Sequence, residues 1–326
     1  MSDKNVIRKR IEKLRQVIDY HRHLYHVLDR QEISDEALDA LKKELFDLEQ
    51  DYPDLITADS PTQRIGGKPI LGFKKFEHSE PMLSFNDAFD ERDMKEWESR
   101  FERVSADSKK NGYYCELKID GLAIELIYRK AKFEIGSTRG DGYIGEDVTQ
   151  NLVTVEAIPL SLPEEDAIVK NLKKQGLGRF VEKIRQSLAG EIIVRGEVFI
   201  TRKDFERINV EQKKAGLKVY ANPRNLAAGS IRQLDPAITR SRQLDSFAYS
   251  LKTNFGQITH EEEHLILKAL GFKTNSNNKF CSDLDKVYEF RNYWEKHREG
   301  LNYEIDGVVV IVNDSKTFQK LGVVGK

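Results

Sequence analysis

A run of apolar and aromatic residues that ends abruptly in charge is the feature that most constrains this chain. Residues 113–121 read Tyr-Tyr-Cys-Glu-Leu-Lys-Ile-Asp-Gly, and a second β-type run follows at 122–128. Two such runs joined by a short polar turn that contains glycine predict a β-hairpin. In that hairpin Lys118 lies at the rim of a sheet, and Glu116, two residues earlier, lies on the same face.

A lysine at a sheet rim is a nucleophile only in its neutral form, which burial or a nearby cation favours. A lone Lys-x-Asp-Gly sequence is more often a solvated turn, so Lys118 is a candidate only through the motifs that accompany it. One of these is Thr-Arg-Gly-Asp-Gly at 138–142, where the glycines permit a tight turn. Arg139 in that turn is either an ordinary exposed arginine or a phosphate ligand beside Lys118.

The bulk composition limits the possible classes of protein. With 326 residues, 39% of them hydrophobic and 33% charged, the chain is long enough for two globular domains. Its net charge of −1 argues against a general polyanion-coating protein. Two cysteines cannot form a disulfide framework or a four-cysteine zinc site. No signal peptide and no apolar run of about 18 residues is present, so we expect a cytoplasmic protein.

Helical periodicity and turn residues divide the chain into two predicted domains. Residues 1–70 form a helical hairpin, with helices at 4–28 and after the capping residue Ser34, and a Gly/Pro-rich linker closes the domain. Residues 71–326 mix strands and helices. The strands are expected at 131–137, 191–200, 244–251 and 304–312, and the helices at 91–104, 201–212, 259–271 and 284–298. The charged segment 163–189 is interpreted as a surface insertion.

Two further stretches carry polar residues in unusual places. Arg195 and Glu197 share one face of an otherwise apolar strand, which indicates either a polar pocket floor or an exposed edge. The segment 220–235 is rich in small residues and carries Arg224 and Arg232. It is either a close-approach site for phosphate or a plain connecting loop with a short helix.

Taken together, these motifs resemble the N-terminal part of bacterial NAD-dependent DNA ligases. The resemblance covers essentially the whole chain, and its motifs occur in the family's order at 118–121, 138–142, 195–200, 221–225, 229–235 and 304–309. The helical hairpin matches the family's NAD-specific leader, including Tyr25-His26 and Ser34-Asp35. The resemblance implies an α+β fold. In that fold a helical hairpin precedes an ATP-grasp-like nucleotidyltransferase (adenylation) domain of antiparallel sheets flanked by helices.

The same resemblance implies a reaction. Lys118 would attack the α-phosphate of NAD, release nicotinamide mononucleotide and form a lysyl-AMP. The AMP would then activate the 5′-phosphate of a nick in double-stranded DNA. Lys118, Asp120 and Arg139 are the implied catalytic residues. Mg²⁺ is an implied cofactor, and the cations needed around the phosphates would come from it together with Arg139, Arg224 and Arg232. No metal-ligating residues are assigned.

Binding roles follow residue by residue from the resemblance. Glu116 would read the adenine edge, Tyr249 would stack on the base, and Glu197 would hold the ribose. Ser84 and Phe85 would border the nucleotide. The leader would grip the nicotinamide mononucleotide half and so select NAD over ATP, through Tyr25, His26, Asp35, Leu38 and Asp39.

Two positions depart from the family pattern. Leu38 replaces a tyrosine, and Ile311 in the last strand replaces a lysine that contacts the nucleotide. The sequence also ends before the family's next nucleotide-contacting lysine. We therefore expect a monomeric fragment that is competent at most for adenylation and binds DNA weakly. A non-catalytic adenylate-binding module is the alternative. An ATP-using RNA ligase or capping-type enzyme is disfavoured by the leader.

Overall fold

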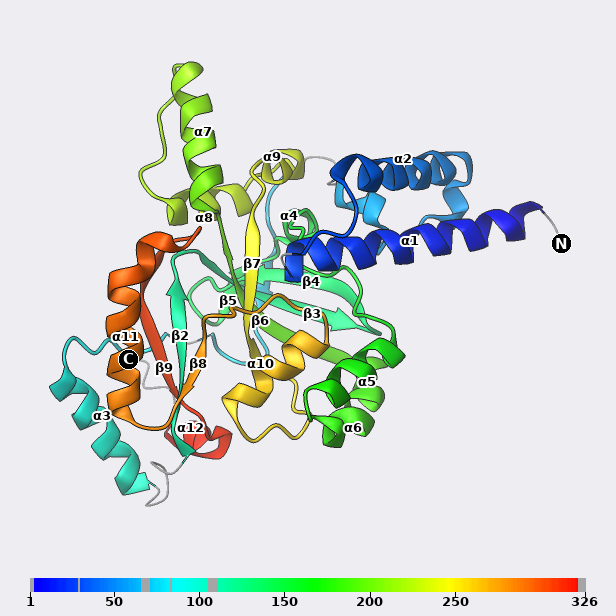
Figure 1. The fold of residues 1–326 in the computed structure, drawn as a ribbon. Coiled ribbons are helices and arrows are strands. Elements are labelled where there is room, and N and C mark those ends of the chain that lie inside the picture. Colours follow the sequence, from blue (N-terminus) through cyan, green and yellow to red (C-terminus); the bar gives the residue numbers. More distant parts are fainter. Residues whose placement is uncertain (1–2, 29, 66–70, 83, 105–110, 322–326) are drawn as a thin grey trace.

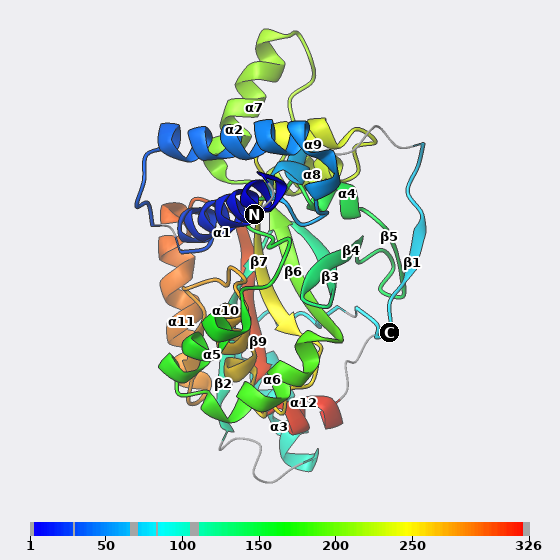
Figure 2. The ribbon, with the colours of Figure 1, turned by 90° about the vertical axis from the view of Figure 1, so that its right-hand side faces the viewer.

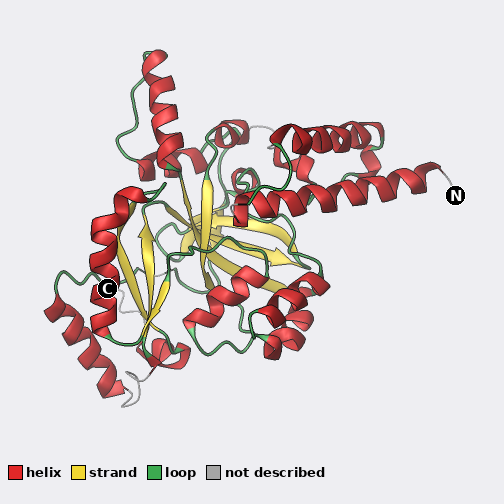
Figure 3. Cartoon of the chain, viewed as in Figure 1, coloured by secondary structure: helices red, strands yellow, loops and turns green. Residues whose placement is uncertain are grey.

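The computed structural model describes residues 3–28, 30–65, 71–82, 84–104 and 111–321. The predicted Gly/Pro-rich linker at 66–70 lies outside them. Within the described residues, every helix is too short or too polar to cross a lipid bilayer. The predicted class is confirmed, because a helical N-terminal segment precedes antiparallel sheets flanked by helices (Figure 3).

The N-terminal hairpin consists of α1 (Asp3–Leu28) and α2 (Asp35–Asp51), followed by short 3₁₀ turns at Pro53–Leu55 and Pro61–Ile65. Ser34 caps α2 as predicted, since its side chain accepts a hydrogen bond from the Ala37 amide. The two helices bury one apolar stripe each, which contains Ile11, Leu14, Ile18, Leu38 and Leu45. Figures 1 and 2 show the hairpin at one end of the molecule, beside α9 (Pro236–Ser241).

Buried Arg64 joins the hairpin to the rest of the chain. Its guanidinium donates hydrogen bonds to the carbonyls of Val153 (3.1 Å), Val155 (2.9 Å) and Ile158 (2.7 Å). Hydrogen bonds from a charged donor to buried acceptors are among the stronger ones in proteins. This arginine therefore fixes the hairpin against the segment that follows α4 (Thr149–Leu152).

The first of two larger sheets has the order β8-β2-β9, with β8 at Lys279–Cys281, β2 at Tyr113–Ile119 and β9 at Ile305–Val312. All pairs are antiparallel. One face, with Tyr113, Cys115 and Leu117, packs into a core shared with α11 (Leu284–His297). Because side chains alternate along a strand, Tyr114, Glu116 and Lys118 lie on the other face. α3 (Glu91–Val104) and α12 (Ser315–Leu321) complete this half.

The second sheet has the order β4-β3-β6-β7 and is also antiparallel. Its strands are β3 (Leu122–Arg129), β4 (Lys132–Thr138), β6 (Glu191–Phe199) and β7 (Asp245–Leu251), and a small pair joins β1 (Lys75–Glu77) to β5 (Ile144–Glu146). The flanking helices are α5 (Glu165–Lys174), α6 (Val181–Leu188), α7 (Arg202–Lys214), α8 (Pro223–Ile231) and α10 (His260–Ala269). The largest apolar core lies between this sheet and its helices.

The predicted hairpin between β2 and β3 is wrong. β2 pairs with β8 and β9, whereas β3 pairs with β4 and β6, so the chain passes from one sheet to the other at Asp120 and Gly121. A Cβ on Gly121 would lie 2.3 Å from the carbonyl oxygen of Val198, so this glycine is required by a close backbone approach. Local turn chemistry cannot reveal this, since strand partners distant in sequence decide it.

The surface insertion predicted at 163–189 is also wrong. Its two helices, α5 and α6, cover the second sheet. These helices and the segment with a short 3₁₀ turn between them contribute buried side chains to the main core: Ile168, Leu172, Leu177, Phe180 and Ile184. The charged residues between these apolar positions face solvent. Composition alone therefore suggests a surface segment, although one face of each helix is apolar and buried.

Candidate active site

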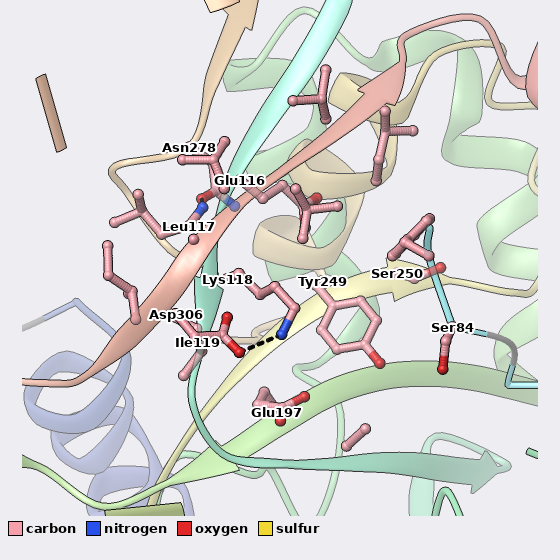
Figure 4. A pocket seen from close by; sticks show the side chains of 18 of the residues that line it. Ser84, Glu116, Leu117, Lys118, Ile119, Glu197, Tyr249, Ser250, Asn278 and Asp306 are labelled. Atoms are coloured by element: carbon pink, nitrogen blue, oxygen red, sulfur yellow. Dashed lines mark hydrogen bonds and ion pairs between the residues drawn. The ribbon is translucent and has the colours of Figure 1, made fainter. Parts of the chain in front are cut away.

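A cavity between the two sheets collects the motif residues. Its lining comes from β2, β9, β6 and β7, together with α8 and the segment before α3. Of the predicted residues, it is lined by Ser84, Phe85, Glu116, Lys118, Arg139, Glu197, Arg224, Arg232, Tyr249 and Ile311. Strands far apart in sequence therefore bring the scattered motifs to one place (Figure 4).

Lys118 lies near the end of β2 with its Nζ in the cavity. It donates a hydrogen bond to Oδ2 of Asp306 at 2.7 Å, and its side chain is 45% exposed (Figure 4). This differs from the expected desolvated lysine beside a cation, because the hydrogen-bond partner is a carboxylate.

Asp306 is a residue that the sequence reasoning did not single out. In the β2–β9 register Lys118 is opposite Gly307 while Ile119 is opposite Ile305, so Asp306 is the extra residue of a β-bulge. The bulge turns its carboxylate toward Lys118. The signal was present, since Asp306 belongs to the motif at 304–309.

Asp120 follows β2 and is held in place by a backbone hydrogen bond and by an ion pair with Arg224. Its amide donates to the Glu304 carbonyl at 3.0 Å, and its Oδ1 lies 3.6 Å from a guanidinium nitrogen of Arg224. Burial and nearby Asp306 raise the pKa of Asp120, while Arg224 and Lys118 act against that rise. Pro223 at the first position of α8 fixes Arg224 in the first turn, where it faces the cavity.

Arg139 occupies the turn after β4 and meets Ser84. Its amide donates to the Ala123 carbonyl at 3.0 Å, and its guanidinium donates to Oγ of Ser84 at 3.2 Å. Gly140 has φ of 57°, and a Cβ there would lie 1.8 Å from the Ile144 carbonyl oxygen. The predicted glycine turn is therefore confirmed and aims Arg139 at the cavity. Arg232 also lines the cavity, with its Nε paired to Glu146 at 2.8 Å.

Glu197 and Tyr249 lie on the second sheet across the cavity from β2 (Figure 4). Burial raises the pKa of Glu197 to about 8, although Lys118, Arg224 and Arg139 act to lower it. This carboxyl is therefore largely protonated at neutral pH and can donate one hydrogen bond as well as accept one. Burial also raises the pKa of the Tyr249 phenol.

Arg195 lines the cavity with Glu197, as the pocket-floor prediction expected, and it also holds neighbouring backbone in place. Its Nε is 2.8 Å from Oε2 of buried Glu125, and the guanidinium also donates to the carbonyls of Pro81 (3.0 Å) and Glu80. The other Glu125 oxygen meets Nδ1 of His78 at 2.9 Å. This buried network fixes the segment that presents Ser84.

Glu116 is buried against two histidines that the sequence reasoning missed. Its Oε1 lies 2.6 Å from Nε2 of His260 and 2.7 Å from Nε2 of His264. Burial alone would raise the pKa of Glu116, but His264 and His260 outweigh it and lower that pKa to about 2. The available signal was the four-residue spacing of the histidines, which places both on one face of α10.

Ile311 lies on the cavity face of β9. It is opposite Tyr114 in the β2–β9 register, and its side chain is buried. Because β2 alternates, this is the face that also carries Glu116 and Lys118. The position is therefore on the correct side to reach a bound nucleotide, but it offers a hydrocarbon surface where a cation was expected.

The hairpin residues assigned to nicotinamide mononucleotide do not line this cavity. His26 lies 3.8 Å from Glu156 and packs edge-on to Tyr25, and burial lowers the pKa of His26 to about 3. Asp39 pairs with Lys42 on the exposed side of α2, and Asp35 accepts from Gln31. Leu38 packs in the hairpin core, which leaves it little surface for a ligand.

Comparisons with known proteins match both parts of the chain. Residues 71–326 match a family model described as the NAD-dependent DNA ligase adenylation domain, and residues 4–66 match one described as a DNA ligase-like, N-terminal NAD⁺-binding domain. Similar curated proteins include the DNA ligases of Acetivibrio thermocellus (45% identical over 97% of this chain) and Koribacter versatilis (45% over 98%). The DNA ligase of Oceanobacillus iheyensis is 41% identical over 99% of the chain. The chain spans 44–45% of the length of these relatives.

Proposed function

Because the chain belongs to the NAD-dependent DNA ligase adenylation-domain family, we propose that its cavity takes AMP from NAD onto Lys118. The Lys118 amine, once it has lost a proton, forms a bond to the α-phosphorus. The bond from that phosphorus to the phosphate of nicotinamide mononucleotide breaks, and the leaving phosphate departs with its electron pair. In the whole enzyme the AMP then passes to a 5′-phosphate at a DNA nick.

The observation that supports this proposal is the convergence of opposite charges around one lysine. Asp306 accepts a hydrogen bond from Nζ at 2.7 Å and is placed to take its proton. Arg139, Arg224 and Arg232 line the same cavity and can balance the charge on the phosphates. In phosphoryl transfer, positioning and charge stabilisation supply most of the catalysis.

The nucleoside half fits the deeper walls of the cavity. Tyr249 offers a ring for stacking on the purine, and Glu197 offers a carboxyl to the ribose hydroxyls. Glu116 is available to the purine edge through the oxygen that does not face the two histidines. The hairpin would have to move toward the cavity to bring Tyr25, His26, Asp35 and Asp39 to the nicotinamide half.

A magnesium ion suits the oxygen donors present. Asp120 and Asp306 carry carboxylates near Lys118, and Mg²⁺ is usually held by one or two carboxylates together with substrate phosphates. When bound, the ion would neutralise charge on those phosphates. We also propose a monomeric, cytoplasmic protein whose final acceptor, nicked double-stranded DNA, is bound weakly by this part alone.

The test is an intact mass after incubation with NAD and Mg²⁺, and separately with ATP and Mg²⁺. We expect a gain of one AMP with NAD only, which is lost in Lys118→Ala. A gain with ATP would contradict the assignment of the hairpin to NAD selection. Lys203→Ala, on the exposed side of α7, is the matched control and keeps the gain.

A catalytically impaired adenylate-binding module is the second candidate. Ile311, at the position where a cation was expected, is the observation that favours it. In that case NAD or AMP would bind, as measured by calorimetry, without any mass gain. Nucleotide binding with no lysyl-AMP in both the native chain and Ile311→Lys would decide for this candidate.

A further inference from the structure

Three buried side chains, Glu116, His260 and His264, form a cluster beside the cavity, and the proposed transfer gives no role to its two histidines. Nε2 of His260 and Nε2 of His264 approach Oε1 of Glu116 at 2.6 and 2.7 Å, and the two nitrogens lie 3.3 Å apart. All three side chains are buried, and one ligand atom from each lies within 4.8 Å of the others. We propose that this cluster binds a divalent first-row transition-metal ion, with Zn²⁺ as the best match, and that the bound ion excludes the purine.

The geometry of the nitrogens fits zinc. Ligands about 2.0 Å from a tetrahedral Zn²⁺ are separated by about 3.3 Å. The two Nε2 atoms already have that separation, 3.3 Å. The Glu116 oxygen is closer to them than this, so it would have to withdraw by about 0.6 Å to take its place in the coordination sphere.

Both Nε2 atoms face the same carboxylate oxygen, and they also face each other. A carboxylate oxygen can accept a hydrogen bond from both rings when each ring carries a proton on Nε2. A metal ion would replace those protons and occupy the space between the three atoms. Imidazole and carboxylate together are ligands that suit zinc and its neighbours in the first row.

The elements that carry the ligands are held in place. Thr259 caps α10 by accepting from the Glu262 amide at 3.1 Å, and His260 and His264 follow one turn apart. Glu116 lies on β2, which is paired on one side with β9. Behind the site, Glu263 Oε2 lies 3.6 Å from Nδ1 of His260. A carboxylate behind a histidine ligand is common in metal sites, where it orients the ring.

The ion would enter from the cavity. Glu116 and His260 both line the cavity, while the Tyr114 ring covers the two histidines at centroid distances of 5.4 and 4.8 Å. Three protein ligands leave a fourth position open toward the cavity. If the proposed adenylation holds, a metal ion on Oε1 pulls the whole Glu116 carboxylate out of its present position. The other carboxylate oxygen, which is meant for the purine edge, moves with it, so zinc would compete with the nucleotide.

Cobalt(II) is the probe for binding, because a tetrahedral Co²⁺ site absorbs visible light. We expect one equivalent of Co²⁺ to give visible bands in the chelator-treated chain and Zn²⁺ to abolish them. His264→Leu and His260→Gln should each weaken Co²⁺ binding at least tenfold. His297→Gln, on the exposed face of α11, is the control and keeps the bands. Circular dichroism verifies that each variant is folded.

Three results would overturn the metal site. The first is the absence of visible bands at one equivalent, and the second is bands that persist in both folded histidine variants. The third is a thiolate-to-cobalt charge-transfer band, since Cys115 and Cys281 would then be the ligands. Lys118→Ala should keep the bands although it cannot be adenylated, so failure of the metal site and failure of the proposed function are distinguishable.

The inhibitory part is tested by calorimetry of AMP binding with and without saturating Zn²⁺. We expect the apparent Kd for AMP to rise at least tenfold with zinc in the native chain and to stay unchanged in His264→Leu. Equal affinity in the presence and absence of zinc would contradict the competition. If AMP does not bind at all, both the proposed function and the competition are wrong. The metal site is then tested by the Co²⁺ titration alone.

Discussion

Replacement of Glu197 by glutamine should stabilise the chain in alkaline solution. Burial in the cavity wall raises the pKa of this carboxyl from 4.5 to about 8. Between those two values the folded chain holds a proton that the unfolded chain has released. Stability therefore falls as pH rises through this window, because the unfolded state gains free energy by ionising while burial keeps the folded state protonated. Glutamine has nearly the same shape and never ionises.

The magnitude follows from the pKa difference. A difference of about 3.5 pH units corresponds to about 5 kcal/mol, at ~1.4 kcal/mol per unit. Water in the open cavity screens the charge, so we expect about 2 kcal/mol at about pH 9 and about zero at about pH 5. The assay is urea unfolding followed by tryptophan fluorescence across this range, with exposed Glu12→Gln on α1 as the control. A Glu197→Gln gain that does not change with pH, or a loss at high pH, would refute the reasoning.

Three other experiments test separate parts of the account. Arg195→Met should lower the free energy of unfolding by roughly 3–5 kcal/mol, because it removes the arginine that pairs with buried Glu125. Denaturant unfolding measures this difference, and a change below about 1 kcal/mol would contradict the prediction. Gly121→Ala should destabilise the chain by about 2–3 kcal/mol, because its Cβ meets the Val198 carbonyl at 2.3 Å. Gly229→Ala in α8, whose Cβ meets nothing within 4 Å, should stabilise the chain slightly in the same denaturant-unfolding experiment. Ile311→Lys should speed lysyl-AMP formation roughly tenfold in a mass-spectrometric time course, unless another cation already serves the phosphates.

The cavity lining was largely predictable because it depends on motifs. Arg139 and Arg224 each occur in a short sequence whose glycine or proline fixes the local backbone, so both their identity and their approximate direction are encoded nearby. Lys118 was identified from its motif, although the turn predicted after it was wrong. The helices were equally accessible, since caps such as Ser34 and Thr201 are local signals that the structure confirms.

Strand pairing and buried charge were not predictable in the same way. The hairpin expected across Asp120 and Gly121 fails because β9, almost 190 residues further on, pairs with β2 in preference to its neighbour in sequence. The partners of Glu116 and Lys118, namely His260, His264 and Asp306, come from equally distant segments. A local sequence pattern does not predict which distant residue will contact a given side chain.

The central claim is that Lys118 becomes covalently bonded to AMP supplied by NAD. Peptide mapping of the NAD-treated chain by tandem mass spectrometry tests it most directly. The account predicts an acid-labile AMP adduct on the peptide that contains Lys118 and on no other peptide. An AMP adduct on a different residue, or one that survives acid as a phosphate ester would, contradicts it.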